Sequence, residues 1–375
     1  MSPIPSSTFS STPQVERQPK ATSRKRRRII RTLIILLLLS GAVVAWQLLN
    51  AYNNSTDPTV AGRPLSNPHT HLHTVVLGEK PGVAYLGTHF GLFTSRDGGR
   101  TWPQSHGALN NYMVTAIAAS PSNPDVLALI VIPTSGLGKQ SGIAISHDGG
   151  TTWQISTPSG LSSLAYPFTV KAGTGASGQF YAFYFYTGWL ETRDLGAHWY
   201  PITRGTLSNM QAPSLLTDPL DPNHLYLGGD QGLYETRDDG SHWIHIPAIQ
   251  GNVLSIVGTD TTPRIYYCAT DQGFYYWREG SSHITQITHL PMSGTLTRLA
   301  TDATGKALYG LSGRDLWFSL DSGTTRAHRW HFDRGDLISL IVDPLKPRNL
   351  YAGFFLPPKV VHSMDGGSTW QTLTE

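Results

Sequence analysis

The sequence contains a single cysteine, Cys268, among its 375 residues. An intrachain disulfide and a cysteine-rich metal centre are therefore both excluded. Cys268 lies in the apolar run 265–269. That setting predicts a residue on a buried strand with an unreactive thiol.

Positive charge is scarce outside the first 50 residues. Those 50 residues hold eight of the 28 Lys and Arg and one of the 25 acids, which leaves 20 bases against 24 acids, a net charge of −4, for the remainder. A nucleic-acid-binding domain needs a basic face. We therefore predict that nucleic acid is not a partner.

One segment, 32–49, runs for 18 residues without a charge. As a helix it is about 27 Å long, close to the roughly 30 Å of a bilayer's hydrocarbon core. It follows the basic residues 24–28, so the positive-inside rule predicts a cytoplasmic N-terminus. We expect a disordered cytoplasmic tail over 1–31, a single-pass transmembrane signal-anchor helix over 32–49, a linker over 50–68 and an extracytoplasmic domain at the cell membrane. A cleaved signal peptide is the alternative.

The region 69–375 repeats the motif S-x-D-G-G-x-T-W. Three copies are complete, two are near copies, one lacks its tryptophan and one has decayed. The copies begin at residues 95, 146, 192, 236, 277, 319 and 363 and are 41 to 51 residues apart. This spacing fits four short strands and their turns. The sequence therefore predicts an all-β, seven-bladed β-propeller.

The motif resembles the Asp-box, or BNR, repeat of the sialidase-like superfamily, found in sialidases, xyloglucan-degrading hydrolases, sortilin-type receptors and the photosystem II assembly factor. The resemblance implies a fold more than a function, because those proteins share the box and not a reaction. In physical terms the box is a turn in which the Asp carboxylate accepts backbone N–H groups, the glycines permit positive φ and the Trp covers the blade core. We assign this structural role to Asp97, Asp148, Asp194, Asp238, Asp321 and Asp365, and to Trp102, Trp153, Trp199, Trp243 and Trp370.

The resemblance implies that ligands bind on the face that carries the turns between second and third strands. Candidate ligand-binding residues there are His89, Tyr112 and Arg314. Asp230 and Asp271 each begin a D-Q-G in adjacent blades, so their carboxylates are a candidate acid–base pair for glycoside hydrolysis. A tight hairpin turn also explains D-Q-G, and we favour that interpretation. The Arg-Ile-Pro segment that precedes the first box in sialidases is missing, so sialidase activity is not expected.

His69, His71 and His73 alternate, so on a strand they would share one face and could bind zinc or copper. No acid or fourth ligand is apparent nearby. We therefore predict a solvated, loosely ordered start to the first blade, with no metal site and no cofactor. The aromatic run Phe180–Trp189 is interpreted as a buried strand rather than a sugar-binding surface.

Two functional hypotheses follow. The first is a non-catalytic binding or assembly propeller that engages a protein or a cell-surface polymer, such as a polysaccharide, through its loop face. The second is a glycoside hydrolase of the xyloglucanase type that uses Asp230 and Asp271. A hydrolase needs its two carboxylates about 5–10 Å apart with one pKa raised, whereas a binding propeller needs an exposed aromatic or charged patch.

Overall fold

The computed structural model describes residues 65, 70–134, 139–211, 213–287, 294–321, 323, 325, 327–344 and 346–373. All of them belong to the second of two compact units, Thr59–Glu375. The predicted tail and anchor, and the linker apart from Leu65, lie outside these residues. Within the described ranges, no helix is both long and apolar enough to span a membrane.

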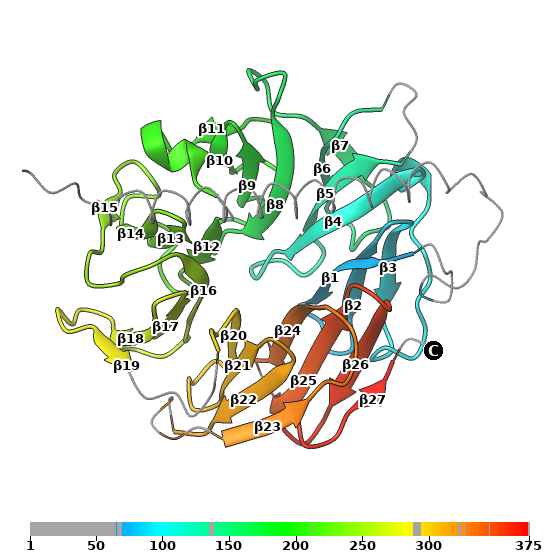
Figure 1. The fold of residues 1–375 in the computed structure, drawn as a ribbon. Helices are drawn as coiled ribbons and strands as arrows, with labels where there is room; N and C mark the ends of the chain where they lie inside the picture. Colours follow the sequence, from blue (N-terminus) through cyan, green and yellow to red (C-terminus); the bar gives the residue numbers. More distant parts are fainter. Residues whose placement is uncertain are drawn as a thin grey trace, which may run out of the picture. The chain divides into compact units, whose positions relative to one another are not determined.

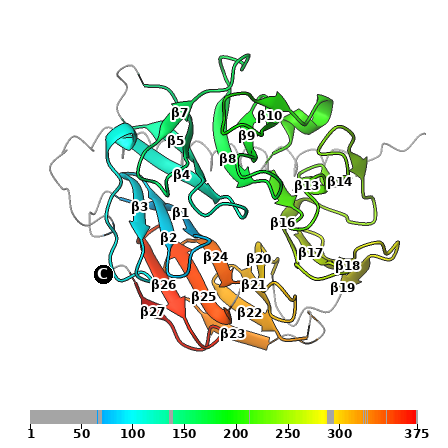
Figure 2. The ribbon, with the colours of Figure 1, turned by 180° about the vertical axis from the view of Figure 1, so that it is seen from behind.

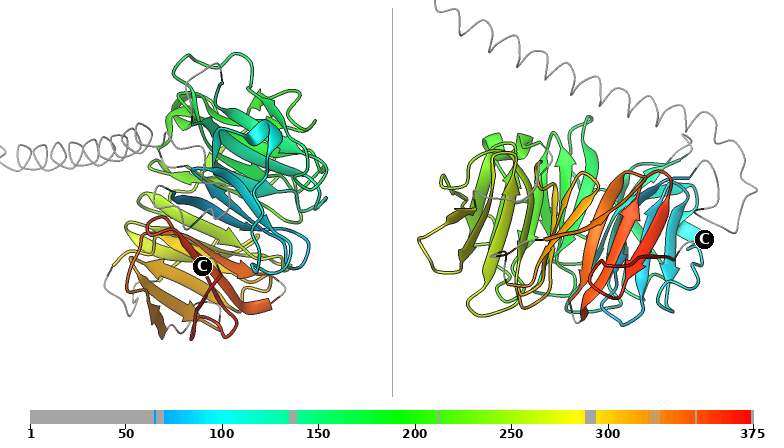
Figure 3. Two further views of the ribbon diagram at one scale, coloured as in Figure 1. Left: turned by 90° about the vertical axis from the view of Figure 1, so that its right-hand side faces the viewer. Right: turned by 60° about the horizontal axis from the view of Figure 1, so that its bottom comes forward.

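Seven antiparallel sheets form a ring (Figure 1). The strands of each sheet are consecutive in sequence, so every blade is built from one stretch of chain. This confirms the predicted all-β, seven-bladed propeller. Figure 2 shows the same ring from behind, and Figure 3 shows the blades from the side.

The strand bounds follow blade by blade. Blades one to three contain β1 (Leu72–Leu77), β2 (Ala84–Thr88) and β3 (Gly91–Ser95); β4 (Tyr112–Ala119), β5 (Leu127–Pro133), β6 (Gly142–Ser146) and β7 (Gln154–Ser156); and β8 (Tyr166–Ala172), β9 (Phe180–Phe185), β10 (Gly188–Thr192) and β11 (Tyr200–Pro201). Blades four and five contain β12 (Ser214–Thr217), β13 (Leu225–Gly229), β14 (Gly232–Thr236) and β15 (Ile244–His245); and β16 (Val253–Gly258), β17 (Ile265–Thr270), β18 (Gly273–Arg278) and β19 (Thr285–Ile287). Blades six and seven contain β20 (Arg298–Thr301), β21 (Leu308–Ser312), β22 (Asp315–Ser319) and β23 (Ala327–His331); and β24 (Leu337–Asp343), β25 (Lys346–Phe354), β26 (Lys359–Ser363) and β27 (Gln371–Thr372). Two 3-10 turns, η1 (Gly107–Leu109) and η2 (Gly205–Asn209), lie between blades.

The ring closes by contact between the first and last blades. The first strands of the blades, β1, β4, β8, β12, β16, β20 and β24, contact one another around the centre (Figure 1). In the described part of blade one, an isolated bridge between Phe93 and Gln104 takes the place of a fourth strand. Blade seven is held to it where the Leu72 N–H donates to the carbonyl of Phe355 at 3.4 Å. The indole N–H of Trp102 also donates to the carbonyl of Leu373 at 3.3 Å.

Each copy of the motif forms a turn between the third and fourth strands, called here a box turn. In the first, Asp97 Oδ1 accepts the N–H groups of Arg100 and Thr101, both at 3.0 Å, and Oδ2 accepts the Thr101 hydroxyl at 2.7 Å. Gly98 and Gly99 have φ of 75° and 92°, a region that favours glycine. The backbone and hydroxyl hydrogen bonds from Thr101 lower the pKa of Asp97 to about 2. Equivalent carboxylate contacts occur at Asp148, Asp194, Asp238, Asp321 and Asp365. The predicted structural role of the Asp residues is confirmed.

The box tryptophans are held by hydrogen bonds as well as by packing. In the three complete copies, the indole N–H donates to the carbonyl of the second box glycine at 3.1 to 3.2 Å. Trp243 donates instead to the carbonyl of Ile202 in the preceding blade, at 2.7 Å. Only Trp153 is buried, at 9% exposure, whereas Trp102, Trp199, Trp243 and Trp370 are half-buried. The predicted packing against the blade core therefore holds most fully for Trp153.

Cys268 is fully buried in β17, and burial raises the pKa of its thiol, as expected of an unreactive cysteine. The segment Lys346–Asn349 belongs to β25, because the pairing of Asp343 with Lys346 closes the hairpin between β24 and β25 early.

Candidate functional site

The antiparallel topology places two kinds of connection at one end of every blade. These are the turns between second and third strands and the connections to the next blade, and the end that carries them is called the loop face. The box turns lie at the other end. All of the predicted ligand-binding and catalytic residues belong to the loop face.

Asp230 and Asp271 are exposed, and each bonds within its own blade. Asp230 Oδ1 accepts the N–H of Gln211 at 2.7 Å. Asp271 accepts the backbone N–H of Asn252 at 2.8 Å and the side-chain amide of the same residue at 2.9 Å. Equivalent bonds in two neighbouring blades indicate that each carboxylate fixes the connection entering its blade. This supports the turn interpretation of D-Q-G.

The other candidates differ in accessibility. Tyr112 is buried in β4, with the ammonium group of Lys139 4.6 Å from its ring centroid, which argues against direct contact with a ligand. Arg314 is exposed, and its Nη1 donates to the carbonyl of Asp333 at 2.5 Å. His89 is buried in the turn between β2 and β3.

Blade three presents exposed apolar side chains on the loop face. Leu164 and Tyr186 are 68% and 69% exposed, and Tyr166 and Phe168 at the start of β8 are also exposed. Tyr166 pairs across the strands with Phe185, and the rings of Phe168 and Phe185 lie 5.0 Å apart. We call the four exposed residues the blade-three aromatic surface.

Sequence reasoning missed the exposure of Tyr186 because it assigned the whole run Phe180–Trp189 to the core. That prediction is confirmed for Phe180–Tyr184 of β9 and for Trp189, which are buried, whereas Phe185 is partly buried. It is wrong for Tyr186, which occupies the turn after β9 with a φ of 63° and points away from the core. The signal was the Tyr-Thr-Gly that marks the turn inside the aromatic run.

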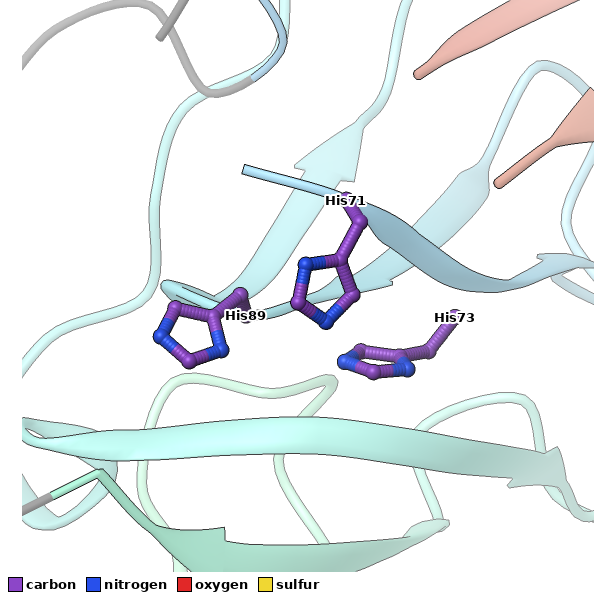
Figure 4. A group of neighbouring side chains, drawn as sticks. All are labelled: His71, His73 and His89. Atoms are coloured by element: carbon purple, nitrogen blue, oxygen red, sulfur yellow. The ribbon is translucent and has the colours of Figure 1, made fainter. Parts of the chain in front are cut away.

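Three imidazoles converge on the loop face of blade one, and we call them the histidine cluster (Figure 4). His71 precedes β1, His73 lies in β1, and His89 follows β2. The register that pairs Leu72 with Thr88 brings residues 71 and 89 together, and the His89 N–H donates to the His71 carbonyl at 3.2 Å. One nitrogen of each ring is turned toward the other two rings, and one ligand nitrogen per ring lies within 4.8 Å of the other two.

The histidine cluster is enclosed. His71 is 6% exposed, His89 is 2% exposed and His73 is half-buried. Phe355, from the equivalent turn of blade seven, covers one side, with its ring centroid 4.8 Å from that of His71. The prediction of a solvated, loosely ordered start to blade one is therefore wrong for His71 and His73, since β1 packs against blade seven. His69 lies outside the described residues.

Burial keeps these imidazoles neutral. It lowers the pKa of His71 to about 4 and that of His73 to about 3, and neighbouring imidazoles add to both shifts. Burial also lowers the pKa of His89. His71 Nε2, His73 Nε2 and His89 Nδ1 are buried and have no hydrogen-bond partner in the described part of the chain. Buried polar atoms without partners are uncommon and need a physical reason.

The described residues contain a second group of potential metal ligands, formed by Asp218, His224 and Glu279. These side chains already bond to other side chains of the protein. Arg264 Nε lies 2.6 Å from Asp218 Oδ2, and Arg264 Nη2 donates to Glu279 Oε1 at 2.8 Å. His224 contacts Asp218 Oδ2 and Glu235 Oε1, each at 2.8 Å. Because a guanidinium lies between the carboxylates, this group is a structural ion-pair network that joins blades four and five. We call it the Asp218 network.

Comparison with known proteins adds evidence on the fold. No protein-family model matches the chain, and no curated protein matches it. Among solved structures, the GH74 xyloglucanase from Xanthomonas campestris shows 14% identity and a TM-score of 0.63 over 81% of this chain and 54% of its own. An ancestral GH74 enzyme shows 18% identity and a TM-score of 0.60 over 81% of this chain and 46% of its own. YCF48 from Cyanidioschyzon merolae shows 18% identity and a TM-score of 0.49 over 71% of this chain and 87% of its own.

The likenesses to the two GH74 enzymes agree with the propeller described above, and at this level of identity they concern the fold alone. The chain spans about half the length of these two enzymes.

Proposed function

We propose that this chain is a non-catalytic binding propeller that engages a protein partner through the blade-three aromatic surface. The observation that carries the proposal is that four apolar side chains at the loop face of blade three are exposed. Exposed apolar patches mark interaction sites in soluble domains, and aromatic anchors dominate binding at protein interfaces. Leu164 offers no ring for stacking on a sugar, so the mixed surface favours a protein over a polysaccharide.

We further propose that the propeller is displayed outside the cell membrane and belongs to the Asp-box, sialidase-like superfamily. The uncharged segment 32–49 behind the basic residues 24–28 supports the display. The six box turns with the same carboxylate contacts support the superfamily assignment. A box carboxylate that proved essential to turnover rather than to folding would contradict that assignment.

A glycoside hydrolase that uses Asp230 and Asp271 is the second candidate, because both carboxylates are exposed on adjacent blades of the loop face. The geometry gives it less support. Each carboxylate is exposed and already accepts hydrogen bonds from the connection that enters its own blade.

Site-specific cross-linking tests the binding proposal. The native cysteine is buried, so it does not compete with an introduced cysteine for the labelling reagent. Since Cys268 is fully buried, Tyr186→Cys introduces the one accessible thiol among the described residues. Met364→Cys is the matched control, because Met364 is 62% exposed but lies in a box turn on the opposite face. Intact native cells that express either variant are treated with a membrane-impermeant maleimide that carries a photo-cross-linker. We expect both variants to be labelled and only Tyr186→Cys to form a covalent adduct with another protein.

Each departure from this result has a distinct meaning. If neither cysteine is labelled in intact cells but both are labelled after lysis, the propeller is not displayed outside. If both are labelled and give the same adducts, the blade-three aromatic surface is not the protein-binding site.

A further inference from the structure

The histidine cluster has the features of a built ligand site that the proposed binding function does not use. It lies on blade one, away from the blade-three aromatic surface in sequence and on a different sheet. Three ring nitrogens that no described group satisfies, His71 Nε2, His73 Nε2 and His89 Nδ1, are buried, and one ligand nitrogen of each ring lies within 4.8 Å of the other two. A propeller that needed only packing here would place apolar side chains at these positions.

From this arrangement we propose that His71, His73 and His89 bind one late first-row transition-metal ion, Zn²⁺ or Cu²⁺, through three neutral imidazoles. Imidazole suits zinc and copper, whereas Mg²⁺ and Ca²⁺ require oxygen ligands. With three protein ligands, a tetrahedral ion keeps a fourth position for water or another ligand.

The spacing suits such an ion. Three atoms that all lie within 4.8 Å of one another share a point no more than 4.8/√3, about 2.8 Å, from each of them. Zinc–imidazole bonds are about 2.0–2.1 Å long, so each nitrogen has to move inward by less than about 1 Å. Small rotations of the three rings supply that movement.

Burial also prepares the ligands. His71 and His89 are buried, so their rings are already held out of solvent. Phe355 shields one side of the cluster from solvent.

The position explains what the ion would do for the protein. His71 directly precedes β1, the strand at which the described chain enters the ring, His73 lies in β1, and His89 belongs to the turn after β2. An ion bound by all three ties the start of β1 to the body of blade one, beside the contact with blade seven that closes the ring. Bound metal would therefore stabilise the closure.

The test uses the full-length chain in detergent, stripped with a chelator and dialysed against Zn²⁺, Cu²⁺ or Mg²⁺. We expect one equivalent of Zn²⁺ or Cu²⁺ per chain, none of Mg²⁺, and a rise in melting temperature with the bound ion. His73→Leu and His89→Gln should each weaken that binding by at least about a hundredfold, since loss of a mere outer-shell partner already costs 10–100-fold.

His362→Leu is the matched control, because His362 is another partly buried histidine whose Nε2 lacks a partner, but it stacks on Tyr351 in blade seven. This variant should bind the ion like the wild type. His73→Leu without metal should melt at or above the metal-free wild type, because it removes an unsatisfied buried nitrogen. X-ray absorption at the metal edge of the loaded wild type should show scattering from three imidazoles. This measurement needs no variant, so it tests the proposal even if a variant fails to fold.

The proposal is overturned if the wild type takes up neither ion at one equivalent. Uptake that His73→Leu and His89→Gln leave unchanged, or an absorption spectrum without imidazole scattering, overturns it equally. Each of these results leaves the protein-binding proposal untouched, because that proposal is read out by cross-linking at Tyr186.

Discussion

Replacing Trp153 with alanine is expected to lower the free energy of unfolding by about 3–5 kcal/mol, the usual cost of truncating a buried tryptophan. Trp153 packs with Leu127, Leu129 and Ala144 in the core between blades one and two. Its indole N–H also donates to the carbonyl of Gly150. The substitution therefore removes packing and leaves the part-buried carbonyl of Gly150 without this donor. Chemical denaturation of wild type and variant measures the difference.

Trp102→Ala provides the comparison. Trp102 makes the same hydrogen bond to its own box glycine, but it is half-buried, so its removal should cost less. An unchanged denaturation midpoint for Trp153→Ala would show that the box tryptophan does not anchor the blade core. Equal losses for the two variants would assign the effect to the hydrogen bond instead of to burial.

The second large effect is expected for Asp218→Ala, which should destabilise the propeller by about 3–5 kcal/mol, as breaking a buried ion pair does. The Arg264 side chain is only 7% exposed, and the His224 side chain is fully buried. Removal of the carboxylate leaves both cations without their shared partner. Asp230→Ala is the control, because Asp230 is exposed and accepts one backbone N–H, so its loss should cost about 1 kcal/mol or less.

The Asp218 network should also give the stability a pH dependence with a defined sign. Burial alone would raise the pKa of Asp218, but hydrogen bonds from His224 and others outweigh it, so the pKa falls below 3.8. Burial alone would lower the pKa of His224, yet its bonds to Asp218 and Glu235 raise it above 6.5. The stability that Asp218 contributes to the folded state is therefore lost as the pH falls below 3.8. The stability that His224 contributes is lost as the pH rises above its raised pKa. If Asp218→Ala folds and its free energy of unfolding no longer shows this pH dependence, the dependence is assigned to the Asp218 network. If the pH dependence persists in the variant, the assignment is contradicted.

The fold was predictable because each box turn specifies its own geometry. In the complete copies, a short carboxylate, two glycines and a tryptophan at fixed spacing define a turn locally. The six box turns and the decayed seventh copy lie 41 to 51 residues apart, which leaves room for one blade each. Where a box departs from the pattern, tertiary contacts explain the change. Asp239 stands where the complete boxes have their first glycine, at a φ of 55°, and it accepts the hydroxyl of Tyr181 from the preceding blade at 2.5 Å.

The candidate sites were less predictable because they depend on register and on strand ends. His89 is 16 positions beyond His73 along the chain, and only the pairing of Leu72 with Thr88 brings it beside His71. Tyr186 is exposed because β9 ends one residue before it, and sequence reasoning does not fix strand ends to that accuracy. Asp230 and Asp271 were correctly associated with hairpin turns, since the D-Q-G pattern is a local signal.

The claim that the loop face binds and does not cleave is tested most directly by assaying the purified full-length chain for turnover. Xyloglucan, cellulose, pectin and sialylated substrates cover the activities of the resembling families. A binding propeller is expected to give no turnover above buffer, and Asp230→Asn and Asp271→Asn are expected to leave the melting temperature close to that of the wild type. Turnover that either substitution lowers by a hundredfold or more, about 2.7 kcal/mol in the activation barrier, would contradict the claim and identify the two carboxylates as catalytic.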